Sequence, residues 1–369
     1  MNPGLKIKEW GINLLLIAAS LLAIIVVLEV AIRVTLPTWY PRYAFIADDD
    51  AGYRNTPDKK LRFKSNEFDF ISESNSYGYR DDPFEPDGRK VVMAIGDSFC
   101  WGFGVDYNEL FLTIAEKNLG VRIVKACVSG YGTRQALALF RKDKARINPD
   151  VVLLNFFIGN DFYENTSVRN LTIVDGWFRE TAPETSSMIH KSITWLRSRF
   201  RIVELVIEKI KSSPKLYALV KRAGLAGGDI IDQLDLYRKK ERPEVTRAYD
   251  ITSDQLKQLK EAAEDIGARL IVVIIPTKNQ VNPAPFLEEV EEMGKRAGDF
   301  DFMKPRDRLK KMLGKLDVAV IDMTPAFRAE TKRNAGASLY YKIDRHWNRA
   351  GQALAGRELS KKLKEIAGW

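Results

Sequence analysis

The chain has 369 residues, of which 45% are hydrophobic and 29% are charged. This composition is typical of a globular protein of one or two domains and excludes an intrinsically disordered chain. The net charge of +9 suits nucleic acid, an anionic membrane surface or acidic glycans, so charge alone does not choose a partner. With only two cysteines and two histidines, at no ligand-like spacing, a disulfide framework and a metal site are not expected.

Residues 11–28, GINLLLIAASLLAIIVVL, contain no charged side chain. About 18 to 20 such residues in a helix span a hydrocarbon core of about 30 Å. Lys6 and Lys8 precede the segment, as expected for an N-terminus on the cytoplasmic side, although basic residues also follow it. A cleaved signal peptide is the alternative, but its apolar region normally has about 7–15 residues and ends at a small-x-small site. We therefore predict an uncleaved membrane anchor over residues 1–36.

Residues 37–88 are rich in polar and turn-forming residues and predict an irregular connector. Regular patterns begin after it, so residues 89–369 are predicted to form one domain. Five apolar runs there suit strands of a parallel sheet that is covered on both faces. They are KVVMAIGDS (90–98), VRIVKACVSGYG (121–132), DVVLLNFFIGND (150–161), ARLIVVIIPT (268–277) and DVAVIDMTP (317–325).

Helical patterns alternate with these runs, which predicts an α/β fold: a three-layer α/β/α sandwich around a five-stranded parallel sheet. They lie at 133–147, 252–267, 284–298, 304–316 and 348–366. Cys100 and Cys127 fall in or next to apolar runs and are predicted to be free buried thiols.

Residues 162–250 interrupt the alternation and predict a helical insertion. Within them, residues 189–225 look like two amphipathic helices separated near SSP at 212–214, and they carry nine Lys/Arg against two Glu. One interpretation is a helical pair packed on the domain with a solvated basic face. The other is a pair of helices on the anionic membrane beside the anchor. Because the anchor places this domain outside the cytoplasm, nucleic acid is not expected as a partner.

Chemically useful residues follow the predicted strands, where ligands of open parallel sheets bind. Ser98 ends the first run and can act as a nucleophile, and His346, before the last helix, can act as its base. Asp344 can accept a hydrogen bond from the other ring nitrogen, because residues two apart in an extended segment point the same way.

An acyl-transfer site also needs donors for the developing oxyanion. We predict these to be the backbone N–H of Ser98, the backbone N–H of Gly130 and the side-chain amide of Asn160. A glycine lets the backbone approach the substrate closely, and an asparagine offers an N–H without charge. Asp97 is predicted to support the site by capping the turn, and Trp347 by packing under the histidine or by lining the acyl pocket.

Four blocks in order, GDSF (96–99), the glycine at 130, IGND (158–161) and DRHWN (344–348), resemble the SGNH hydrolases, also called the GDSL family. The resemblance covers about residues 90–369. It implies a flavodoxin-like sheet, ester hydrolysis or acyl transfer, and no metal or organic cofactor. The family's four name-giving positions then fall on Ser98, Gly130, Asn160 and His346.

One departure bears on the reaction. The acid stands two residues before the histidine, whereas the family usually has it three before. This D-x-H-W block is similar to that of exopolysaccharide O-acetyltransferase relatives of the family, which raises the possibility of transfer in place of simple hydrolysis.

We therefore predict a single-pass protein of the cytoplasmic (inner) membrane, held by residues 11–28 and with its catalytic domain on the extracytoplasmic side. It would be a serine esterase that hydrolyses acyl esters, such as O-acetyl groups of a glycan or lipid-linked substrate, through an acyl-Ser98 intermediate. The alternative is an O-acyltransferase that moves an acyl group from a membrane donor, with a membrane partner protein, to an envelope polysaccharide or glycolipid. A non-catalytic glycan-binding scaffold is a third possibility, which the complete set of blocks argues against.

Overall fold

In the computed structural model, the described residues are 3–35, 41–166, 170–174, 176–181, 188–212, 216, 219–220, 233–292, 294–334, 336 and 338–369. The chain divides into two compact units. One comprises residues 1–38 and 180–228, and the other comprises residues 39–179 and 229–369. The predicted boundaries between the anchor, the connector, the domain and its insertion, at residues 36, 88, 162 and 250, stay predictions.

The larger unit is built on one five-stranded parallel sheet in the order β11-β10-β7-β5-β6. Its strands are β5 (Val91–Gly96), β6 (Arg122–Cys127), β7 (Val151–Phe157), β10 (Arg269–Ile275) and β11 (Ala319–Asp322). Each predicted apolar run forms one of these strands. The side chains of β5, β6, β7 and β10 are almost all buried, as in a sheet covered on two faces, whereas those of the edge strand β11 are mostly half-buried. The order places the first strand between the second and the third, which confirms the flavodoxin-like arrangement.

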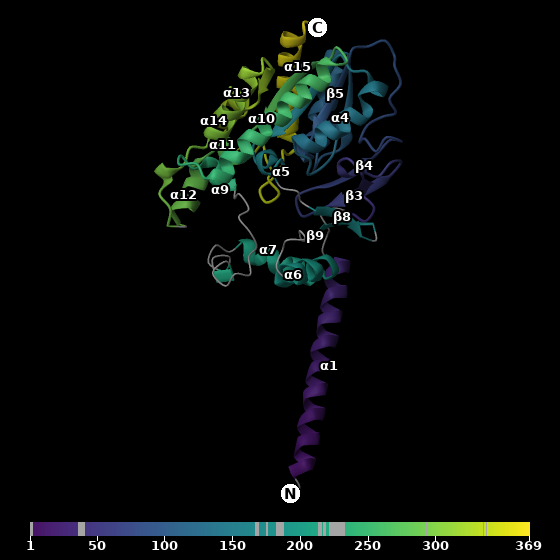
Figure 1. Cartoon of the computed structure of the whole chain (residues 1–369), viewed down its shortest axis with the longest axis vertical. Helices are drawn as coiled ribbons and strands as arrows, with labels where there is room; N and C mark the ends of the chain where they lie inside the picture. Colours follow the sequence, from purple (N-terminus) through teal and green to yellow (C-terminus); the bar gives the residue numbers. More distant parts are fainter. Residues whose placement is uncertain are drawn as a thin grey trace. The chain divides into compact units, whose positions relative to one another are not determined.

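Helices cover both faces of this sheet and complete the predicted sandwich (Figure 1). On one face α3 (Phe111–Leu119) packs against α15 (Arg349–Ala367), and on the other α4 (Thr133–Ile147) packs against α10 (Pro243–Glu264). The remaining helices of this unit are α2 (Ser98–Trp101), α5 (Asp161–Glu164), α9 (Gln233–Tyr237), α11 (Lys278–Val281), α12 (Ala284–Glu292), α13 (Lys304–Lys315) and α14 (Thr324–Arg333), with single 3-10 turns at Tyr107–Glu109 and Ala297–Asp299. The sequence patterns missed α3 and α14, which have only nine and ten residues.

The predicted irregular connector is wrong, because this segment folds into two antiparallel hairpins. The first pairs β1 (Phe45–Asp48) with β2 (Gly52–Asn55), and the second pairs β3 (Lys60–Lys64) with β4 (Asp69–Glu73). Strands of four or five residues are too short to show a clear alternation in sequence. They are stable here because their apolar sides pack in the main hydrophobic core. For example, the rings of Phe63 on β3 and Phe70 on β4 stack with centroids 5.1 Å apart.

The predicted helical insertion is partly β-structure. A third hairpin, β8 (Asn170–Val174) with β9 (Trp177–Thr181), precedes its helices, and α10 begins before residue 250. The first of the two predicted basic helices is divided at Phe200 into α6 (Met188–Arg199) and α7 (Arg201–Ser212), and α7 ends at the predicted break near residues 212–214. Most of residues 213–225 lie outside the described part of the chain.

The smaller unit contains α6, α7 and α1 (Pro3–Thr35). Residues 12–35 of α1 contain an 18-residue window with a mean hydropathy of 2.9, so this helix is long and apolar enough to cross a membrane, by length and composition. This helix covers the segment in which the anchor was predicted.

The prediction of free thiols is wrong, since Cys100 and Cys127 form a disulfide. Their Cα atoms lie 5.6 Å apart although 27 positions separate them in sequence. Strands β5 and β6 are neighbours with Gly96 opposite Cys127, and α2 begins two residues after β5. This register brings the two side chains together, and residue spacing alone could not reveal it.

Candidate active site

The predicted nucleophile stands on a sharp turn between a buried strand and a short helix. Strand β5 ends at Gly96, and Ser98 is the first residue of α2. Asp97 caps this helix, because its Oδ1 accepts the N–H of Phe99 at 2.9 Å. Gly96 has φ 148°, and a Cβ there would lie 2.6 Å from the carbonyl oxygen of Asn155 on β7. The turn therefore requires a glycine directly before the Asp-Ser pair.

Ser98, His346 and Asp344 meet in one hydrogen-bonded chain. The Oγ of Ser98 lies 2.7 Å from Nε2 of His346, although the two residues are 248 positions apart. Nδ1 of His346 lies 2.6 Å from Oδ1 of Asp344. The carboxyl side chain is only 3% exposed and the imidazole 19%, so the acid is buried and the base remains open to a substrate. In the neutral tautomer that this geometry suits, Nδ1–H donates to Asp344 and Nε2 accepts the serine proton.

The predicted oxyanion donors follow the two strands that flank β5. Gly130 lies beyond the end of β6, and Asn160 lies beyond the end of β7. Gly130 has φ 81°, and a Cβ there would lie 2.7 Å from the hydroxyl of Tyr53. Oδ1 of Asn160 is buried and has no hydrogen-bond partner among the described residues. The two residues are placed on either side of the serine strand, and their role as donors stays a prediction.

Trp347 packs in the core, which decides between its two predicted roles. Its ring is fully buried, stacks on Phe327 with centroids 4.8 Å apart and meets the edge of Phe99 at 5.3 Å. Phe99 in turn lies 4.7 Å from the imidazole of His346, centroid to centroid. Trp347 therefore supports the histidine from below.

Two buried carboxyl groups lie beneath the site. Asp97 and Asp161 are almost completely buried, and each has one oxygen without a hydrogen-bond partner among the described residues. Burial raises the pKa of Asp97 to about 7, against a smaller opposing effect of His346. Burial, reinforced by the charge of Asp97, raises the pKa of Asp161 well above its usual value. The folded protein therefore disfavours the state in which Asp97 and Asp161 are both ionised.

The predicted catalytic acid, Asp344, is held by a residue that sequence analysis missed. Glu67, in the turn between β3 and β4, accepts three backbone N–H groups of the loop that carries Asp344. The distances are 2.7 Å from Lys342, 3.0 Å from Ile343 and 2.8 Å from Asp344 itself. No local signal could have identified Glu67, because it lies 277 positions before Asp344.

A second missed residue holds the serine turn. Arg80 is fully buried and donates to the carbonyl oxygens of Gly102 at 2.8 Å and Val105 at 2.7 Å, just after α2. Its guanidinium also lies 4.8 Å from the ring centroid of Phe70. Burial lowers the pKa of Arg80 to about 9. A buried cation that binds mainly carbonyl oxygens fixes the backbone around the nucleophile.

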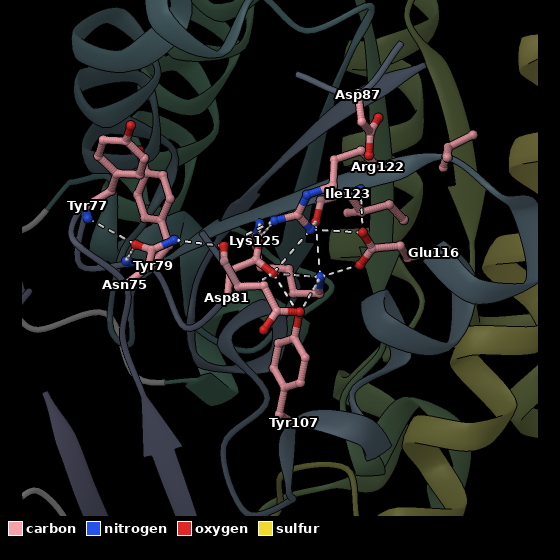
Figure 2. A network of polar contacts seen from close by, with 12 residues as sticks. Asn75, Tyr77, Tyr79, Asp81, Asp87, Tyr107, Glu116, Arg122, Ile123 and Lys125 are labelled. Atoms are coloured by element: carbon pink, nitrogen blue, oxygen red, sulfur yellow. Dashed lines mark hydrogen bonds and ion pairs between the residues drawn. The ribbon is translucent and has the colours of Figure 1, made fainter. Parts of the chain in front are cut away.

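Next to Arg80, a buried ion-pair network fastens the same segment to β6 (Figure 2). Asp81 accepts from Arg122 at 2.9 Å and from Lys125 at 3.0 Å, and both cations also pair with Glu116 of α3 at 2.8 and 2.5 Å. Tyr107 donates to Asp81 at 2.7 Å. Two acids and two bases balance within the core, so each charge keeps a partner. In the described part of the chain, no group of three or more His, Cys, Asp or Glu is placed to hold a metal ion.

The C-terminal third of the chain is similar to a known family. Residues 236–368 match the family model described as SGNH hydrolase-like domain, acetyltransferase AlgX. This segment includes the predicted acid and histidine, and the match confirms the resemblance to SGNH hydrolases. No curated protein matches the chain.

Several solved structures are similar to the chain at low identity. An acetyl xylan esterase, AlAXEase, has a TM-score of 0.40 and 12% identity over 73% of this chain and 98% of its own. The psychrotrophic esterase EstA from Pseudoalteromonas sp. has a TM-score of 0.38 and 11% identity over 76% of this chain and 100% of its own. The lipase/acylhydrolase from Enterococcus faecalis has a TM-score of 0.38 and 11% identity over 75% and 96%.

Proposed function

We propose that this chain is a membrane-anchored serine esterase with an SGNH hydrolase-like domain. It removes acyl groups, in particular O-acetyl groups, from glycan or lipid-linked substrates of the cell envelope. The observation that carries the proposal is the continuous hydrogen-bonded chain from Ser98 through His346 to Asp344. A hydroxyl with a base and a buried orienting acid is the arrangement that acyl transfer requires.

The reaction follows from this arrangement. Ser98 Oγ attacks the acyl carbonyl carbon while Nε2 of His346 takes the hydroxyl proton, and Asp344 stabilises the resulting imidazolium. The N–H groups of Ser98 and Gly130 and the amide of Asn160 are proposed to bind the oxyanion. The tetrahedral intermediate collapses to acyl-Ser98, and His346 returns the proton to the departing alcohol. Water then attacks the acyl-serine with His346 as its base, which releases the acid and restores Ser98.

The site is proposed to work on the extracytoplasmic side of the cytoplasmic membrane. The apolar helix α1 supports a single membrane span. The Cys100–Cys127 disulfide supports an oxidising compartment, since structural disulfides are rare in the cytosol.

The second candidate function is O-acyltransfer to an envelope polysaccharide or glycolipid. Two observations favour it: the matched family model is of the acetyltransferase type, and the acid stands two residues before the histidine. The acyl-serine would be the same, and a sugar hydroxyl would replace water as the attacking group. An acyl donor in the membrane, delivered by a partner protein, would then supply the acyl group.

The proposal is tested with the full chain in detergent and nitrophenyl acetate as substrate. Ser98→Ala is expected to lower kcat by about 1,000-fold or more, because the nucleophile is lost. Ser360→Ala on α15 is the matched control and is expected to keep the wild-type rate. A Ser98→Ala rate equal to wild type would exclude acyl-serine chemistry. Added envelope oligosaccharides then separate the two functions, since only transfer yields acylated sugar.

A further inference from the structure

Helix α6 exposes several large apolar side chains to solvent. They form two adjacent pairs seven residues apart, followed by one more side chain four residues on, which places them along one side of the helix and its end. They are Met188, Ile189, Trp195, Leu196 and Phe200. Trp195 is 57% exposed. An apolar patch of this kind on a folded protein indicates a surface that contacts something other than water.

The junction of α6 and α7 is bound to α1 by polar contacts. Glu29 of α1 is buried, and its carboxylate accepts the N–H of Arg201 at 2.8 Å and of Ile202 at 2.9 Å. These are the first residues of the 12-residue helix α7, so Glu29 satisfies free donors at the positive end of its dipole. Arg33 pairs with Glu29 at 2.6 Å and donates to the carbonyl of Arg199 at 2.6 Å.

The position of Glu29 along α1 sets the depth of this junction. Glu29 lies nineteen positions after Trp10, which is about 28 Å along a helix and close to the hydrocarbon thickness of about 30 Å. Trp10 is 73% exposed and is a suitable anchor at one membrane–water boundary. Glu29, with Arg33 beside it, then lies at the other boundary, where charged groups meet the lipid headgroups.

We propose that α6 and α7 lie in the membrane–water interface of an anionic membrane, with the apolar side of α6 in the upper acyl region. This inference rests on the proposed membrane span of α1. The two helices carry six Lys/Arg against two Glu over residues 188–212, a charge that complements anionic headgroups. A tryptophan among aliphatic side chains is typical of this boundary.

The test uses the intact chain reconstituted in vesicles of phosphatidylcholine and phosphatidylglycerol whose acyl chains are brominated at a shallow position. Bromine quenches tryptophan emission on contact. The quenched emission is compared among wild type, Trp195→Phe and Trp10→Phe, each of which removes the signal of one tryptophan. Both variants are expected to lose part of the quenched emission, and the share of Trp195 is expected to fall when phosphatidylglycerol is omitted.

The outcomes separate this inference from the span on which it rests. If Trp10 contributes to quenching and Trp195 does not, the interfacial helix is excluded and the span stands. If neither contributes, the span itself is excluded and the inference with it. A Trp195 contribution that does not depend on phosphatidylglycerol would overturn the role given to the basic residues.

Discussion

At the scale of single residues, the hydrogen bonds of Glu67 hold the loop that carries Asp344, the predicted catalytic acid. Its carboxylate accepts the N–H groups of Lys342, Ile343 and Asp344. Glu67→Gln removes the charge and one of the two acceptor oxygens, so the loop and the Asp344 carboxylate are expected to shift. We expect kcat to fall by about 10- to 100-fold with KM nearly unchanged, because small misplacements in a catalytic site are costly.

Glu73→Gln is the matched control for this prediction. Glu73 ends the same hairpin, and its carboxylate pairs with Lys60 at the surface. It is expected to keep the wild-type kcat. The pH profile of kcat/KM is measured in parallel, and a changed apparent pKa of the base in Glu67→Gln would show that the effect passes through Asp344 and His346. Equal kcat values and profiles in both variants would exclude a positioning role.

Asp97 predicts a pH dependence of stability. Burial raises its pKa from 3.8 to about 7, so between these values the folded chain holds a proton that the unfolded chain has lost. The contribution of Asp97 to stability is therefore complete below about pH 4 and is lost as the pH rises to about 7. Asp97→Asn can keep the cap to Phe99 without titrating. We expect the fall in Tm between pH 4 and 7 to become smaller in this variant.

The surface variant Asp49→Asn provides the comparison, because Asp49 is exposed. It is expected to retain the wild-type pH dependence of Tm, measured by thermal unfolding across this range. Asp161 contributes in the same direction as Asp97, since burial and the neighbouring charge raise its pKa too. A wild-type slope in Asp97→Asn would assign the pH dependence to Asp161 and other groups.

At the scale of elements, the disulfide joins the helix that carries Ser98 to the strand that precedes Gly130. It connects α2 to the end of β6 and closes a loop of 27 residues. Cys100→Ala with Cys127→Ala is expected to lower the free energy of unfolding by about 2–4 kcal/mol, since the unfolded chain gains freedom. Urea unfolding measures this change. The double variant is expected to be insensitive to dithiothreitol, whereas wild type unfolds more easily in it. Equal unfolding of wild type with and without reductant would contradict the prediction.

The two N-terminal hairpins and the segment that follows them hold the loops of the candidate site by hydrogen bonds. The turn between β3 and β4 supplies Glu67 to the acid loop. Tyr53 of β2 donates to the carbonyl of Ser129 at 2.9 Å, directly before Gly130. Arg80, shortly after β4, holds the backbone after the serine helix. The loops that carry Ser98, Gly130 and Asp344 therefore each receive support from a segment that lies outside the matched family model.

At the scale of the whole molecule, the charge is unevenly distributed between the two units. Residues 189–225 carry nine Lys/Arg against two Glu, and they fall within the smaller unit together with the apolar helix α1. The larger unit contains the predicted catalytic residues. This division agrees with the proposal that one unit binds the membrane and the other performs acyl chemistry.

The sequence by itself determined the α/β class, the five strands of the sheet and the residues that follow them. These are local properties of the sequence, because a strand buried on both faces must be apolar throughout. In open parallel sheets, the residues that bind ligands follow the carboxyl ends of such strands. Ser98, His346 and Asp344 could be predicted for this reason, and the order of the motif blocks identified the family they resemble.

Only the tertiary structure decided the contacts between distant segments. The bonds of Glu67 to the Asp344 loop, the Cys100–Cys127 disulfide and the carbonyl contacts of Arg80 each depend on the sheet order and on a hairpin placed against it. Every residue except proline has a backbone N–H group, so a carboxylate that binds such groups does not require particular side chains at those positions. The contact therefore cannot be recognised in the sequence. Folding alone brings such partners within hydrogen-bond distance.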